Sequence, residues 1–140
     1  MNPAAHHLAF HGTIVLLFAL LLGAPYARAI KSNASAQVVN SWRVAHQSLS
    51  LGAAIMFSVA AVLPTLANSP TLAWSVALCL IVSSYAFCIA TPLAAITEDR
   101  GLASGSGGLA RLVYWGNIVG AASSLIGAII LVFAAGVSLL

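Results

Sequence analysis

The chain has 140 residues, of which 61% are hydrophobic and only 5% are charged. A water-soluble domain carries about a quarter charged residues, so this composition excludes a soluble globular protein and indicates an integral membrane protein. The formal net charge of +3 reflects five cations against two anions. Because no basic stripe with interleaved aromatic residues accompanies that charge, we exclude nucleic acid as a partner.

Four long apolar runs follow one another along the chain. Each is near or above the roughly 20 residues that a helix needs to cross a bilayer core of about 30 Å. Isolated strands are excluded, because their backbone groups would stay unpaired in lipid. The sequence therefore predicts an all-α fold, a single domain that forms an integral membrane four-helix bundle in the lipid bilayer, with helices at roughly 11–29, 44–67, 71–96 and 109–140.

The first run ends in Ala27-Arg28-Ala29, which has the small-x-small spacing of a signal-peptidase site. No Lys or Arg precedes this run, however, whereas a secretory signal begins with a positively charged segment. We therefore expect the first run to be a transmembrane helix.

Cations gather beside two of the three connections between the runs. The positive-inside rule places loops 30–43 and 97–108 in the cytoplasm and both termini on the other side of the membrane. We therefore expect a multi-pass protein of the inner (cytoplasmic) membrane. The cations beside the first loop are Arg28, Lys31 and Arg43, and those beside the third are Arg100 and Arg111.

Small residues are frequent in every run, and Gly116 and Gly120 form a small-xxx-small pair in the last one. Such a pair lets two helix backbones approach closely in lipid. The pair serves either helix packing within one subunit or contact between subunits, and the sequence leaves both interpretations open.

One histidine, His46, lies about one helical turn inside the second run from Arg43. Its imidazole can ligate a metal or haem iron, carry a proton, or hydrogen-bond a neighbouring helix. His11 opens the first predicted helix, near the opposite membrane face, so we do not expect both histidines to ligate one haem within a subunit. His6 and His7 are interpreted as a solvated tail. A haem held by His46 alone would keep its sixth iron position open.

Antiparallel threading brings the end of the third run and the start of the fourth to the depth of His46. Thr91, Tyr114 and Asn117 are therefore candidates for a small polar pocket above an apolar cavity, where they would act on a substrate. Arg111, Tyr114 and Asn117 follow an i, i+3, i+6 spacing that we expect to face one direction. The alternative for Tyr114 is anchoring at the membrane interface.

Three arginines at the same face, Arg43, Arg100 and Arg111, are candidates to pair with haem propionates. Their alternative role is to set membrane topology alone.

Several segments carry a resemblance to a known family. The run Trp42-Arg43-Val44-Ala45-His46, with an aliphatic helix that ends in Val62-Leu63-Pro64, resembles the second helix of the styrene oxide isomerase family. His11-Gly12 with the apolar residues after it is similar to that family's first helix. Asp99-Arg100-Gly101-Leu102 resembles its Asn-Arg-Gly-Leu loop. Together these segments cover most of the chain from His11 to the fourth run.

The resemblance implies a membrane protein that assembles into a homo-oligomer, expected to be a trimer, and binds haem b with His46 as the axial iron ligand. It also implies a small lipophilic substrate, an aryl epoxide that is converted to an aldehyde, with ferric iron as a Lewis acid. The family is expected to place a tyrosine, an asparagine and an aspartate near the substrate, where this sequence has Thr91, Gly52 and Ser83.

Three functions therefore stay open at this point. The first is a haem-dependent epoxide isomerase. The second is a haem protein without isomerase activity, which binds a gas or transfers electrons. The third is an accessory membrane subunit without a cofactor.

Overall fold

A computed structural model describes residues 2–99, 101 and 107–139, and within these residues the chain is helical without strands. Four helical spans are long and apolar enough to cross a membrane, which confirms the predicted all-α membrane fold. The first span is divided into two helices. The helices are α1 (Pro3–Leu21), α2 (Gly23–Lys31), α3 (Ala36–Leu66), α4 (Pro70–Thr97) and α5 (Gly108–Val137).

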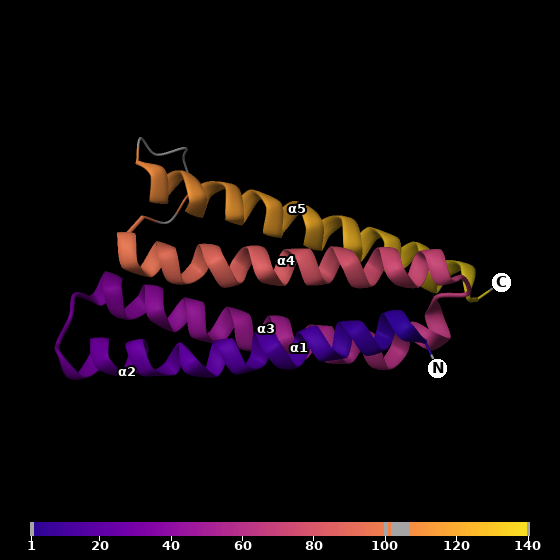
Figure 1. Cartoon of the computed structure of the whole chain (residues 1–140), viewed down its shortest axis with the longest axis horizontal. Helices are drawn as coiled ribbons and strands as arrows, with labels where there is room; N and C mark the ends of the chain where they lie inside the picture. The colour runs from indigo at the N-terminus through magenta and orange to yellow at the C-terminus, as the bar shows by residue number, and fades with distance from the viewer. Residues whose placement is uncertain (1, 100, 102–106, 140) are drawn as a thin grey trace.

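The spans run antiparallel, so that both termini lie at one end of the bundle, as Figure 1 shows. The α2–α3 connection and the ends of the α4–α5 connection lie at the other end, so the two cation-flanked connections share one end as expected. The helix α5 packs against α4 and touches α3 only slightly, whereas α3 packs against α1, α2 and α4. The bundle is therefore open along the side between α3 and α5.

The first helix begins at Pro3, eight residues before the predicted start at 11, which corrects the interpretation of His6 and His7 as a tail. The side chain of Asn2 caps the helix by accepting a hydrogen bond from the N–H of Ala5 at 3.3 Å. Proline in the first turn needs no backbone partner, so Asn2-Pro3 is a typical helix start. His6 and His7 are exposed, but they lie on α1.

The third helix also begins earlier than predicted, at Ala36 instead of 44. Ser35 caps it, because its hydroxyl accepts a hydrogen bond from the N–H of Val38 at 3.3 Å. Most of the segment 30–43 is therefore helix, and the connection is limited to residues 32–35.

The glycine pair on α5 packs against α4 of the same chain. A Cβ atom on Gly116 would lie 2.9 Å from the Cβ of Ala90, and one on Gly120 would lie 2.8 Å from the ring of Phe87. Both distances are shorter than van der Waals contact, so α4 and α5 approach this closely only because these residues have no side chain. The pair therefore serves packing within the subunit.

Candidate functional site

The imidazole of His46 points from α3 toward the junction of α1 and α2. Its Nδ1 lies 2.8 Å from the carbonyl oxygen of Ala19, and its ring stacks on that of Tyr26 with centroids 6.3 Å apart. A carbonyl oxygen can only accept, so Nδ1 donates this hydrogen bond, and in the neutral form of the ring the lone pair lies on Nε2. A metal-ligating histidine is typically held in the same way, with its other nitrogen donating to a carbonyl.

The helix break beside His46 follows from Pro25. Proline lacks the N–H that would bond to the carbonyl of Leu21, and its ring collides with that carbonyl, so the first span is interrupted at Leu22. Gly23 follows the break and faces His46, since a Cβ at this position would lie 3.6 Å from the imidazole Cε1. The sequence analysis identified His46 but missed the helix break at Leu22 beside it. Pro25 is the residue that could have indicated this break.

An apolar cavity of about 450 Å³ lies along the open side of the bundle. Its lining comes mainly from α3, α4 and α5. Its volume falls in the range of small-molecule sites. The three positions at which the family resemblance expects larger polar residues, Gly52, Ser83 and Thr91, all line it.

Thr91 and Asn117 are brought together as predicted, because both line this cavity and a second one of about 310 Å³ that also contacts Asn40. Tyr114 lines neither cavity, and its ring packs edge-on against Trp115 with centroids 5.5 Å apart. The i, i+3, i+6 spacing does not keep one direction, because each step of three residues falls about 60° short of a full turn. The prediction that Arg111, Tyr114 and Asn117 face one pocket is therefore wrong.

The hydroxyl groups in the apolar cavity donate to the protein itself. Those of Ser83 and Thr91 donate to the carbonyls of Gly120 and Phe87, at 2.8 and 2.9 Å. The hydroxyl of Ser84 donates to the sulfur of Met56 at 3.1 Å. Among the described residues, none that lines the cavity carries an ionisable side chain. The cavity therefore offers an apolar surface without an acid or a base.

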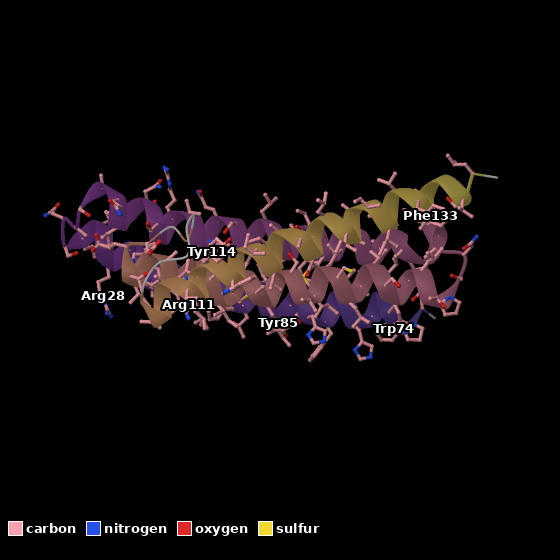
Figure 2. The ribbon with its side chains drawn as sticks, turned by 90° about the horizontal axis from the view of Figure 1, so that it is seen from above. Arg28, Trp74, Tyr85, Arg111, Tyr114 and Phe133 are labelled. Atoms are coloured by element: carbon pink, nitrogen blue, oxygen red, sulfur yellow. The ribbon has the colours of Figure 1, made fainter. Side chains whose placement is uncertain are left out.

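Arg43 and Arg111 lie near the starts of α3 and α5, at the end of the bundle where Figure 2 labels Arg111 and Arg28. Arg43 lies one turn before His46 on α3, and its guanidinium donates to the side-chain oxygen of Asn40 at 2.5 Å. Arg111 is exposed on α5, which is separated from α2 by the other helices, so one chain does not bring it to His46. Arg100 lies outside the described residues.

His46 and the apolar cavity lie on different sides of α3. Ser48 and Gly52 line the cavity from positions two and six residues after His46. At about 100° per residue, these positions face away from the imidazole. A single chain therefore does not place the Nε2 of His46 in the cavity.

The first helix carries a further histidine contact. The Nδ1 of His11 lies 2.9 Å from the hydroxyl of Tyr85 on α4. His11 is well inside α1, so the prediction that it opens the helix is wrong. Ala19, the hydrogen-bond partner of His46, lies eight residues after His11, which is about 12 Å of helix rise.

In the described residues, no three side chains of His, Cys, Asp or Glu form a metal-binding cluster.

The family model described as styrene oxide isomerase matches residues 4–136, which is nearly the whole chain. No curated protein sequence matches the chain.

Proposed function

The chain belongs to the styrene oxide isomerase family, and we propose that it binds haem b and isomerises a lipophilic epoxide to a carbonyl compound. The observation that carries this proposal is the hydrogen bond between the Nδ1 of His46 and the carbonyl oxygen of Ala19. It fixes the ring and leaves the lone pair on Nε2, which would ligate the haem iron.

The residues around His46 fit a haem held by one histidine. The Ala19 carbonyl sets the tautomer, and the Tyr26 ring limits rotation of the imidazole. Arg43 is three residues before His46, so the two side chains leave neighbouring parts of the same helix surface. Arg43 is therefore our candidate partner for a propionate, while Arg111 would reach a propionate beside His46 only from a neighbouring subunit.

Ferric haem, when bound, would supply a Lewis-acidic iron that withdraws electron density from the epoxide oxygen. The apolar cavity would hold the hydrocarbon part of the substrate and exclude the water that adds to an opened epoxide to give a diol. Three of its hydroxyl groups donate to carbonyls and to Met56. Among the described residues, the lining offers no ionisable side chain as an acid or a base. The isomerisation needs no second substrate, because one C–O bond breaks, a hydride moves to the adjacent carbon and a carbonyl forms.

The positions of His46 and of the cavity favour an oligomer. Because they lie on different sides of α3, a second copy is needed to bring the histidine of one subunit to the cavity of the next. Contact between two different surfaces of identical subunits generates a closed ring when the rotation closes. A homo-oligomeric ring, with the trimer as the state that the family resemblance implies, would complete the site in this way.

Haem binding is tested by the absorption spectrum of the protein purified in detergent and reconstituted with haem. We expect a Soret band in the unmodified protein and its loss in His46→Ala, because that variant has no axial ligand. His6→Ala is the matched control, since it removes an exposed histidine on another helix and should keep the band. An unmodified protein without a Soret band, or a His46→Ala variant with an unchanged one, would refute the proposal.

The isomerase activity is tested by adding styrene oxide and larger lipophilic epoxides to the ferric protein. We expect carbonyl products whose formation stops in His46→Ala. A protein that binds haem but forms no carbonyl product from any of these epoxides would be a haem protein of another function. The small residues Thr91, Gly52 and Ser83, in place of the expected tyrosine, asparagine and aspartate, are the observation that favours this second candidate.

We also propose that residues 32–35 and the α4–α5 connection face the cytoplasm, in the inner membrane. The cations at this end of the bundle support that orientation.

A further inference from the structure

Two histidines on α1 lie one helical turn apart, on the side that faces α4. The rings of His7 and His11 stack with centroids 6.4 Å apart and an interplanar angle of 24°. Neither residue takes part in the proposed haem site or in the apolar cavity. We propose that His7 and His11 form a second metal site, which binds a divalent transition-metal ion such as Zn²⁺ or Cu²⁺.

The spacing of the two histidines suits such an ion. Histidines at i and i+4 share one face of a helix, and this is the spacing with which helices hold zinc. Imidazole is a preferred ligand of Zn²⁺, Cu²⁺ and Ni²⁺. Two imidazoles on a tetrahedral ion have ring centres about 5 Å apart, given metal–nitrogen distances of about 2.0–2.1 Å. The observed 6.4 Å would have to shorten, and His7 can move toward His11 because its side chain is exposed.

The surroundings of His11 resemble the support that a metal ligand needs. The phenol oxygen of Tyr85 lies 2.9 Å from its Nδ1 and therefore orients the ring from the adjacent helix. In the tautomer in which Nδ1 donates to this oxygen, the lone pair lies on Nε2. Metal binding would select that tautomer, as it does when a carboxylate or carbonyl supports a ligating histidine.

The site is placed where ions from solution can reach it. His7 is four residues from the start of α1, about 6 Å of helix rise, at the end of the bundle that holds both termini. Its ring also contacts Trp74, with centroids 5.2 Å apart. Trp74 and Tyr85 are labelled along the same edge of the bundle in Figure 2. Two protein ligands leave the remaining coordination positions to water or to a soluble ligand.

The test uses the full-length, haem-reconstituted protein in detergent, with Zn²⁺ titrated by calorimetry and Cu²⁺ examined by electron paramagnetic resonance. We expect one ion per chain, with nitrogen couplings from two imidazoles. His7→Ala and His11→Ala should each weaken binding at least about tenfold. Tyr85→Phe keeps the ring but removes the hydroxyl, and it should weaken binding about tenfold.

Two controls identify the ligands. His6→Ala removes a histidine next to His7 that points about 100° away around the helix, and it should leave the affinity within twofold. His46→Ala should also leave it unchanged. Because His11 contacts α4, circular dichroism must show that His11→Ala is folded. If His11→Ala does not fold, the metal affinity of His7→Ala alone tests the proposal. Equal affinity in His6→Ala and His7→Ala, or loss of binding in His46→Ala alone, would overturn the proposal.

Discussion

Among single residues, Gly52 determines most directly how much space the apolar cavity has. A Cβ atom at this position would meet no heavy atom within 4 Å, so a side chain there would extend into the cavity without disturbing the fold. We predict that Gly52→Leu keeps haem binding but lowers kcat/KM for epoxides by at least about tenfold, because the substrate is displaced from the iron. The Soret band and the rate of carbonyl formation measure the two effects in one preparation.

Gly136→Leu is the matched control for this substitution. Gly136 also has open space around it, near the end of α5, but it does not line the cavity. Its variant should keep both haem and activity. If Gly52→Leu isomerises bulky epoxides at the unmodified rate while its oligomer is intact, the substrate does not bind in this cavity.

The residues of the site differ in how far the sequence determines them. The sequence identifies His46 because it is a histidine within an apolar run. Thr91 and Asn117 were predicted to be neighbours only because antiparallel helices place them at the same depth, and both line the cavity. The depth of Tyr114 gave no information on its direction, and the ring faces Trp115 instead of the cavity. The Ala19 carbonyl has no residue-specific signature, because any residue presents one, and only the folded helix break brings it to His46.

Among the helices, α5 depends on its glycines for contact with α4. We predict that Gly116→Val lowers the free energy of unfolding by about 1–3 kcal/mol, because the new side chain meets the Cβ of Ala90 and the backbone oxygen of Ala86. Backbone atoms cannot rotate away, so the helices must separate. Reversible unfolding in mixed micelles, followed by circular dichroism, measures the change.

Gly136→Val is the control for this packing prediction, since its Cβ would meet nothing within 4 Å. It changes the same residue type on the same helix and should leave the stability within about 0.5 kcal/mol. Equal stability of Gly116→Val and Gly136→Val would show that α5 does not pack on α4 through Gly116.

The helix ends show what hydropathy patterns leave undetermined. An apolar run predicts that a long apolar helix exists, and the structure has such a helical span at each of the four runs. It does not give the ends, because polar side chains continue a helix beyond the bilayer whenever a cap satisfies its first N–H groups. Asn2 and Ser35 are residue types that commonly cap helices, and both can be recognised in the sequence. Had they been used, the predicted starts of α1 and α3 would each lie eight residues earlier.

At the scale of the whole molecule, the bundle divides the proposed site between two of its surfaces. One surface presents His46 beside α2, and the other presents the cavity between α3 and α5. In a ring of identical subunits, each His46 would face the cavity of a neighbour, and every site would be built from two chains. Activity would then depend on which subunits are neighbours.

Mixed oligomers test this arrangement. We predict that pure His46→Ala oligomers are inactive and that pure Gly52→Leu oligomers keep at most about a tenth of the unmodified activity, whereas co-expression in equal amounts raises the activity above both. One interface in four would then join an intact His46 to an intact cavity, so about a quarter of the unmodified activity should return. Separately purified variants mixed without subunit exchange serve as the control and should show only the residual activity of Gly52→Leu. If co-expressed oligomers that contain both variants by mass spectrometry form no more carbonyl product than this control, the division of the site between subunits is wrong.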